Sequence, residues 1–248
     1  MRFKDKIVVV LGGNSGIGLA SAIAFAEEGA RVVITGRNAA TLEQARLAIQ
    51  GNPIAVQSDI SDMAALDALY ARIGAELGRI DALFVNAGIG AFVPVEQVTP
   101  EFFDNMINVN LRGPYFAVQK ALPLLGPGSS VVLTSSIGHA KGLPGNSVYA
   151  ATKAGLRALA RNFGAEFVGR GIRVNCFSPG PIDTPLITRG GLSDDAIESM
   201  REMIRNNVPM KRWGTPQEAA KAVLFLASND ASFITGIDMF VDGGAVSF

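Results

Sequence analysis

Residues 6–18 read KIVVVLGGNSGIG, a short β-branched run followed by a glycine-rich turn and the start of a helical stretch. The same alternation of a short apolar run with a longer helical stretch recurs along residues 1–248. Several of the runs are apolar at every position, which indicates strands covered on both faces. Alternating strands and helices predict right-handed βαβ units. We therefore expect an α/β fold, a doubly wound parallel sheet of about seven strands flanked by helices.

The expected elements can be assigned by residue range. The predicted strands are 6–11, 31–35, 54–57, 82–86, 130–134, 172–177 and 237–241. The predicted helices are 16–28, 41–50, 63–77, 101–125, 148–168 and 216–227, with a weaker one near 194–205. Asp62 or Ser61 would cap the helix 63–77, and Thr215 before Pro216 is a typical N-cap and first-turn pair. Since no repeat, low-complexity tract or linker interrupts the alternation, we expect residues 1–248 to form one Rossmann-type domain.

The composition excludes several classes of function. The 22 Lys and Arg residues balance 22 Asp and Glu residues, whereas nucleic-acid-binding proteins usually carry a basic excess. A single cysteine, Cys176, and a single histidine, His139, leave no disulfide framework and no His/Cys-rich metal site. No apolar run is long enough for a membrane span or a signal-peptide core. We expect a cytoplasmic protein that binds neither nucleic acid, membrane nor metal.

The glycine turn after the first predicted strand favours a dinucleotide site. Gly12, Gly16 and Gly18 permit a tight strand-to-helix turn and let backbone N–H groups approach a pyrophosphate. Their spacing is GxxxGxG, so the general GxGxxG fingerprint is matched only loosely.

The end of the second predicted strand indicates which dinucleotide binds. NAD sites usually have a carboxylate there for the adenosine ribose, and NADP sites have a cation for the 2′-phosphate. Gly36 removes the carboxylate, and Arg37 can supply a guanidinium. NADP(H) is therefore the predicted cofactor. In the alternative interpretation, Arg37 is only a solvated loop charge.

A Ser, Tyr and Lys constellation stands beyond the predicted strand 130–134. Tyr149 is the only one of the three tyrosines with a lysine, Lys153, four residues further on, and such a pair shares one face of a helix. Ser135 and Ser136 directly follow the strand, at the end where this fold binds ligands. Taken alone the pair is weak evidence, since Tyr149 can also be a half-buried helix residue and Lys153 a solvated charge.

In this order and spacing, the motifs resemble those of the short-chain dehydrogenase/reductase family. The residues that carry the resemblance are Gly12-x3-Gly16-x-Gly18, Asn86-Ala87-Gly88, Asn110, Ser136, Tyr149-x3-Lys153 and Pro179-Gly180-x-Ile182-x-Thr184. The resemblance extends over residues 7–244. Leu11 departs from it, standing where the family often has Thr, and so does Val85, which replaces the first Asn of Asn-Asn-Ala-Gly.

The resemblance implies an alcohol dehydrogenase or carbonyl reductase whose catalytic residues are Asn110, Ser136, Tyr149 and Lys153. Tyr149 would be the general acid in reduction and the general base in oxidation, and Lys153 with the oxidised nicotinamide would lower its pKa. Lys153 would also bind the nicotinamide ribose. Ser136 would donate to the substrate oxygen, and Asn110 would hold a water that links Lys153 to solvent. Two alternatives stay open: Ser135 acts instead of Ser136, or Asn110 merely interrupts a helix.

The resemblance also implies a set of cofactor contacts. Asp59 would contact the adenine, and the peptide of Ile182 and the hydroxyl of Thr184 would hold the carboxamide. The predicted cofactor-binding residues are Gly12, Asn14, Ser15, Gly16, Ile17, Gly18, Arg37, Asp59, Ile60, Asn86, Ala87, Gly88, Tyr149, Lys153, Pro179, Gly180, Ile182 and Thr184.

The substrate is expected among the loops 89–95, 137–146 and 185–212, the last of which resembles the family's lid. The apolar residues of these loops favour a neutral, fairly hydrophobic ketone or secondary alcohol. The predicted substrate-binding residues are Ser136, Gly138, His139, Leu143, Tyr149 and Leu186.

The resemblance implies a homotetramer assembled through 101–125, 148–168 and 238–248. Three other functions stay open. A reductase of acyl-carrier-bound 3-oxoacyl substrates would want a basic patch, which zero net charge disfavours. A non-catalytic NADP-binding sensor would be expected to lack part of the catalytic set, and an epimerase or dehydratase would be expected to carry an added substrate domain.

Overall fold

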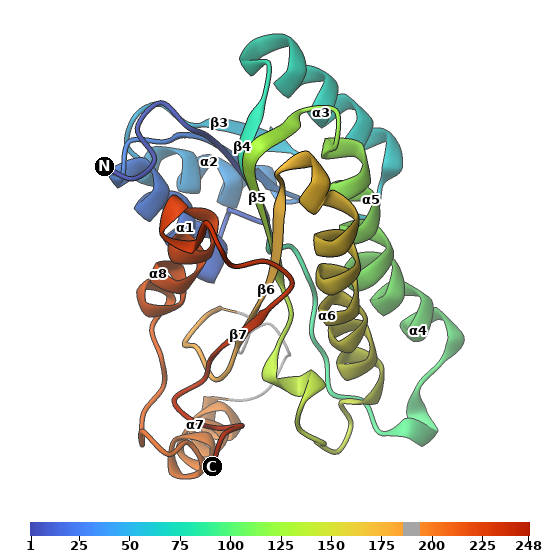
Figure 1. Ribbon diagram of the computed structural model, residues 1–248. Coiled ribbons are helices and arrows are strands. Elements are labelled where there is room, and N and C mark those ends of the chain that lie inside the picture. Colours follow the sequence, from blue (N-terminus) through green and yellow to red (C-terminus); the bar gives the residue numbers. More distant parts are fainter. Residues whose placement is uncertain (186–193) are drawn as a thin grey trace.

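The computed structural model describes residues 1–185 and 194–248, and its centre is a parallel sheet in the order β3-β2-β1-β4-β5-β6-β7 (Figure 1). Its strands are β1 (Ile7–Leu11), β2 (Arg31–Gly36), β3 (Ile54–Gln57), β4 (Ile80–Val85), β5 (Leu125–Thr134), β6 (Arg173–Pro179) and β7 (Asp238–Val241). The predicted doubly wound sheet is confirmed. The strand order reverses between β1 and β4, and the carboxyl ends of these strands open the crevice where such sheets bind ligands.

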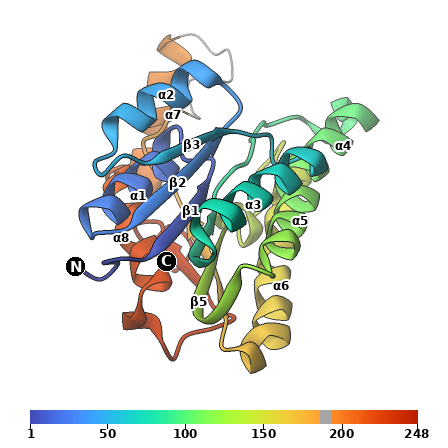
Figure 2. The same cartoon turned by 90° about the horizontal axis from the view of Figure 1, so that it is seen from above.

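Helices cover both faces of the sheet (Figure 2). One face carries α1 (Gly16–Glu27), α2 (Ala39–Ala48) and α8 (Pro216–Ala227), and the other carries α3 (Met63–Leu77), α5 (Gly113–Ala121) and α6 (Ser147–Phe167). The central strands are apolar throughout because successive side chains enter different cores. Val9 packs in the cluster under α3, α5 and α6, whereas Val8 and Val10 pack under α1 and α8.

Local capping chemistry begins two of the helices where it was predicted. The Asp62 side chain accepts hydrogen bonds from the N–H groups of Ala64 and Ala65 at the start of α3. Thr215 and Glu218 form a reciprocal capping box at the start of α8, with Pro216 in the first turn. These interactions satisfy N–H groups that have no partner within their own helix.

The predicted helix 101–125 is wrong in two respects. It is divided into α4 (Pro100–Ile107), a π-helical segment Asn108–Arg112 and α5. Pro114 lacks the N–H that a continuous helix would use, and its ring would meet the carbonyl four residues before it. The helix also ends at Ala121, ahead of Pro123, and Leu125 already pairs with Ile80 in the sheet. The interruption lies at the edge of the sheet where the crevice opens, with consequences for Asn110 described below.

Candidate active site

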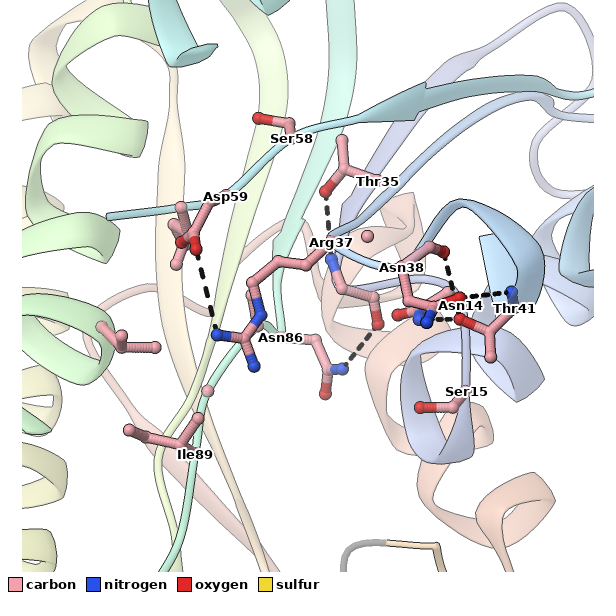
Figure 3. A pocket seen from close by; sticks show the side chains of 16 residues that line it. Asn14, Ser15, Thr35, Arg37, Asn38, Thr41, Ser58, Asp59, Asn86 and Ile89 are labelled. Carbon is pink, nitrogen blue, oxygen red and sulfur yellow. Dashed lines mark hydrogen bonds and ion pairs between the residues drawn. The ribbon is translucent and has the colours of Figure 1, made fainter. Parts of the chain in front are cut away.

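Two neighbouring cavities lie at the carboxyl edge of the sheet. The larger, of about 650 Å³, is lined by Gly12, Asn14, Ser15, Thr35, Gly36, Arg37, Asn38, Thr41, Ser58, Asp59, Ile60, Asn86, Ala87, Gly88, Ile89 and Val109 (Figure 3). The smaller, of about 140 Å³, is lined by Ser15, Gly16, Ile17, Asn86, Gly88, Ile89, Thr134, Ser135, Tyr149, Lys153, Pro179, Thr184 and Pro185. They share Ser15, Asn86, Gly88 and Ile89, so they form two compartments of one site.

Most of the predicted cofactor-binding residues line these compartments. Within the described part of the chain the exceptions are Gly18, Gly180 and Ile182. Gly18 is buried in the first turn of α1, against the backbone of Gly12. The N–H of Gly180 donates to the carbonyl of Val241 at 3.0 Å, and Ile182 is buried. Sequence reasoning missed Thr35, Asn38, Thr41, Ser58, Ile89 and Val109 in the larger compartment. The position of Ser58 directly after β3 is the signal that could have indicated it.

The glycine turn leaves no room for a side chain at Gly12 or Gly18. A Cβ on Gly12, whose φ is +80°, would lie 2.8 Å from the backbone of Ala87, and one on Gly18 would lie 2.0 Å from the carbonyl oxygen of Gly12. The Asn86 amide donates to that oxygen at 3.1 Å, and the Thr35 hydroxyl accepts from the N–H of Gly12 at 3.2 Å. The turn therefore brings the first N–H groups of α1 to the compartment wall without a Cβ in the way.

The two departures from the family pattern lie opposite each other. Leu11 and Val85 are partners in the register of β1 and β4, and both are buried in the same apolar cluster. The N–H groups of Asn86 and Ala87 donate to the carbonyl of Leu11 at 3.0 and 2.8 Å. The end of the strand is thus held by backbone hydrogen bonds and an apolar cross-strand pair.

Arg37 extends along the wall of the larger compartment towards Asp59 (Figure 3). Their closest charged atoms are 3.9 Å apart, and the two side chains are 64% and 36% exposed. Behind them, a Cβ on Gly36 would lie 2.7 Å from Cγ of Asn14, whose amide donates to the Thr41 hydroxyl at 2.9 Å. The space that a carboxylate at residue 36 would need is therefore occupied by Asn14.

Tyr149 and Lys153 lie on one face of α6 and both line the smaller compartment. The Lys153 ammonium is 5.5 Å from the centre of the Tyr149 ring and donates to the carbonyl of Thr134 at 2.8 Å. Burial lowers the pKa of Lys153 to about 8. Burial raises the pKa of Tyr149, and a hydrogen bond with Ser136 opposes this rise. The protein groups alone therefore keep the phenol protonated at neutral pH, and the predicted lowering by Lys153 together with the nicotinamide stays a prediction.

The two serines after β5 have different partners. The buried hydroxyl of Ser135 donates to the carbonyl of Lys153 at 2.8 Å. The Ser136 hydroxyl instead accepts from the N–H of Gly138 at 3.1 Å and lies close enough to the phenol to lower the Tyr149 pKa. This geometry favours Ser136 over Ser135 as the serine that meets a substrate.

Asn110 lies within the π-helical segment, a kind of irregularity that is frequent at functional sites. Its amide oxygen accepts from the N–H of Ile89 and its amide nitrogen donates to the carbonyl of Ile89, both at 2.8 Å. A Cβ on Gly88 would lie 3.2 Å from the Asn110 oxygen and 3.5 Å from Nζ of Lys153. Asn110 therefore lies where the helix is interrupted and also fixes the loop after β4 next to Lys153. Its predicted water stays a prediction.

The predicted substrate-binding residues lie in different places. A Cβ on Gly138 would be 3.4 Å from the Tyr149 ring, and the Leu143 side chain is 40% exposed in the following loop. Nε2 of His139 is 2.7 Å from Oδ2 of Asp238 on β7, and its predicted substrate contact stays a prediction. Leu186 lies outside the described residues.

Part of the predicted lid, 185–212, is the helix α7 (Asp194–Asn207). The Arg201 guanidinium on α7 donates to Asp183 at 2.7 Å, and the Trp213 indole N–H donates to the carbonyl of Arg201 at 3.0 Å. The first contact joins α7 to the segment after β6 that reaches the smaller compartment through Thr184, and the second joins α7 to the segment before α8. Among the described residues, no group of acidic, His and Cys side chains could hold a metal, and no helix is both long and apolar enough to cross a membrane.

Comparison with known proteins finds similarity over nearly the whole chain. A protein-family model described as "Enoyl-(Acyl carrier protein) reductase" matches residues 12–246. The NADP-dependent (R)-specific alcohol dehydrogenase of Lentilactobacillus kefiri is 36% identical, over 98% of this chain and 97% of that protein. The crystal structure of levodione reductase superposes with a TM-score of 0.94 at 34% identity, over 99% of both chains. A structure described as a short chain dehydrogenase/reductase family protein superposes with a TM-score of 0.87 at 38% identity, over 100% of both chains.

Proposed function

Because this chain belongs to the short-chain dehydrogenase/reductase family, whose members act on carbonyl and alcohol substrates with NAD(P)(H), we propose that it is an NADP(H)-dependent carbonyl reductase and alcohol dehydrogenase. Its substrates are neutral, fairly hydrophobic ketones and secondary alcohols. The observation that carries the proposal is that Tyr149 and Lys153 both line the smaller of two joined compartments, with Ser136 close enough to the phenol to affect the Tyr149 pKa.

The residues present fit a phosphorylated dinucleotide. A Cβ at Gly12 or Gly18 would collide with neighbouring backbone, so the turn packs closely and leaves the N–H groups at the start of α1 open to a pyrophosphate. Ser58 lines the larger compartment, and its buried hydroxyl has no hydrogen-bond partner among the described residues, which suits a polar ligand nearby. Arg37 would bind the 2′-phosphate and Asp59 the adenine. When bound, the cofactor supplies or accepts the hydride.

The nicotinamide end belongs in the smaller compartment. Thr184 and the peptide of Ile182 would hold the carboxamide, while Lys153 would donate to the ribose. Lys153 lies 4% exposed and still binds the carbonyl of Thr134, so its position is set before the cofactor arrives. Such preorganisation lowers the entropy cost of binding.

Tyr149 would transfer the proton at its phenol oxygen. In reduction the phenol donates to the substrate oxygen while the Ser136 hydroxyl also donates to that oxygen, which stabilises the charge that develops there. The raised pKa of Tyr149 keeps the phenol protonated at neutral pH, as a proton donor must be, and the predicted lowering by Lys153 and the nicotinamide would make it a stronger acid in the complex. In oxidation the phenolate must accept a proton, and the ammonium of Lys153 stabilises that form.

A screen of ketones with NADPH, and of alcohols with NADP⁺, tests this function through the absorbance of NADPH. Neutral aryl and alkyl ketones are expected to be reduced faster than carboxylated analogues, because the loop 89–95 contains no Arg or Lys to pair with a charged group. Absence of turnover across the screen, with NADPH bound, would contradict the proposal and favour the NADP-binding sensor.

The description of the matching family model favours a second candidate, reduction of an acyl-carrier-bound substrate. The same screen separates the two when it includes 3-oxoacyl thioesters on a free thiol and on a carrier protein. A preference for the carrier-bound form would favour the second candidate.

We further propose that the chain acts as one domain in a cytoplasmic homotetramer. Large apolar side chains are exposed on the segments that the family resemblance implies at the interfaces, among them Phe103, Tyr115, Val168, Phe240 and Phe248. Light scattering after size-exclusion chromatography tests the tetramer, and a monomeric mass would contradict it.

A further inference from the structure

His139 ends a short 3-10 turn, Ile137–His139, that directly follows Ser136. Its Nε2–H donates to Oδ2 of Asp238 at 2.7 Å, and the two side chains are 14% and 6% exposed. The imidazole also stacks on the ring of Phe240, with the ring centres 5.6 Å apart and the planes at 22°. The turn after Ser136 is thereby attached to β7, which lies 99 residues further along the chain.

Asp238 is itself fixed on its other side. The Ser178 hydroxyl on β6 donates to Oδ1 at 2.7 Å, and Nε of Arg157 on α6 lies 3.8 Å from Oδ2. Arg157 is held in turn by donation to the carbonyl of Gly236 at 2.9 Å. A carboxylate with partners from three elements is a rigid acceptor, so the direction of the hydrogen bond from His139 is set by the core.

The opposite end of the turn packs on the proton-transfer residues. A Cβ on Gly138 would lie 3.4 Å from the Tyr149 ring, 3.5 Å from the Ser136 hydroxyl and 2.9 Å from the amide of Asn146. The N–H of Gly138 donates to the Ser136 hydroxyl at 3.1 Å, and the N–H of His139 donates to the carbonyl of Ser136 at 3.2 Å. Any displacement of the turn therefore moves Ser136 relative to Tyr149.

We propose that His139 is a positioning residue, whose hydrogen bond to Asp238 holds the turn Ile137–His139 so that the Ser136 hydroxyl faces the Tyr149 phenol. This inference rests on the proposed function of Tyr149 and Ser136. Among the described residues that line the two compartments, neither His139 nor Asp238 is present. The cofactor site is therefore independent of the hydrogen bond between them. The hydrogen bond acts on proton transfer and leaves cofactor binding unchanged.

The test compares two substitutions of one residue. His139→Phe keeps a ring to stack on Phe240 and removes the donor, whereas His139→Gln keeps an N–H donor near the position of Nε2. Since a displacement of about 1 Å near the reacting groups can cost about a hundredfold in rate, we expect His139→Phe to lower kcat by about ten- to a hundredfold. His139→Gln should recover kcat to within about threefold of the unmodified chain, and the Kd for NADPH should change by less than about twofold in both.

A matched control separates positioning from loss of stability. Asp81→Asn removes a carboxylate that likewise accepts from several donors, among them Lys6 and the N–H of Ile7, but at the start of β4, the opposite end of the sheet. It should lower the melting temperature and leave kcat unchanged. His139→Phe leaves Oδ2 of the buried Asp238 without the donor from His139, which can destabilise the fold. If the single variant does not fold, the double variant His139→Phe with Asp238→Asn takes its place in the kcat comparison.

A titration of Tyr149 tests the same idea without turnover. The phenolate absorbance of Tyr149 is isolated as the difference between a protein and its Tyr149→Phe counterpart. Because the hydrogen bond with Ser136 lowers the Tyr149 pKa, His139→Phe should move this titration to higher pH and His139→Gln should restore it.

An unchanged kcat in His139→Phe, or equal losses in the Phe and Gln variants, would overturn the positioning role. If the unmodified chain turns over no carbonyl or alcohol, the proposed function fails and the titration alone decides. Superimposable phenolate curves for the His139 variants and the unmodified chain would then overturn the inference.

Discussion

Replacing Arg37 with Asp is expected to reverse the cofactor preference. A hydrogen bond between a guanidinium and a phosphate contributes about 1.5–3 kcal/mol. Arg37 is 64% exposed and already faces Asp59 at 3.9 Å, so the low end of that range applies. A carboxylate about 4 Å from a phosphate adds about 1 kcal/mol of repulsion in water. Together these amount to about 2.5 kcal/mol, or about sixty-fold in the Kd for NADPH.

The assay is a pair of fluorescence titrations, with NADPH and with NADH, on each variant. NADH lacks the 2′-phosphate, so its Kd should stay within about threefold, and the ratio of the two constants should shift by more than about tenfold. Arg72→Asp is the matched control, since Arg72 is also exposed and paired with a carboxylate, that of Glu76, but lies on α3 away from both compartments. A ratio unchanged in Arg37→Asp, or changed equally in Arg72→Asp, would refute the phosphate contact.

Three further changes test other parts of the site. Tyr149→Phe should reduce kcat by at least about a hundredfold, the loss expected for a general acid, with the Kd for NADPH preserved; ordinary turnover in this variant would exclude Tyr149 as the proton donor. Burial lowers the pKa of Lys153 from 10.5 to about 8, so the unfolded chain binds more protons between these values. The free energy of unfolding should therefore rise with pH in that window by about 3 kcal/mol relative to Lys153→Met, and parallel denaturation curves for the two proteins would contradict this. Gly36→Asp should lower the melting temperature without improving NADH binding, because its Cβ would lie 2.7 Å from Cγ of Asn14. Adding Asn14→Ala should restore stability and allow NADH to bind, and a stable Gly36→Asp variant with tight NADH binding would show that the collision is absent.

The features that follow from local chemistry were predictable from the sequence. The apolar runs of β1 and β4 indicate strands buried on both faces, and the caps at Asp62 and Thr215 need only residues a few positions apart. Most predicted cofactor residues line the compartments because they follow the strand ends, where this fold brings them together.

The features that the sequence did not indicate depend on contacts between distant segments. The stretch GPGS at 126–129 is typical of a turn, yet it lies in β5 because the strand begins at Leu125, opposite Ile80. The π-helical segment was hidden by a helical apolar pattern, although Gly113 and Pro114 were a visible warning. A lone histidine has no pattern of its own, so the pairing of His139 with Asp238 emerges only when β7 is placed beside β6.

The pairing of Arg37 with Asp59 bears on how fast a cofactor arrives and how long it stays. An incoming phosphate meets an opposed pair of charges instead of a lone cation, so long-range attraction to this wall is weak. Capture rates for the phosphorylated and unphosphorylated dinucleotides should then be similar and only slightly sensitive to salt. The two dinucleotides would then differ mainly in how long they stay bound, since the contact between the guanidinium and the phosphate acts after the phosphate has arrived.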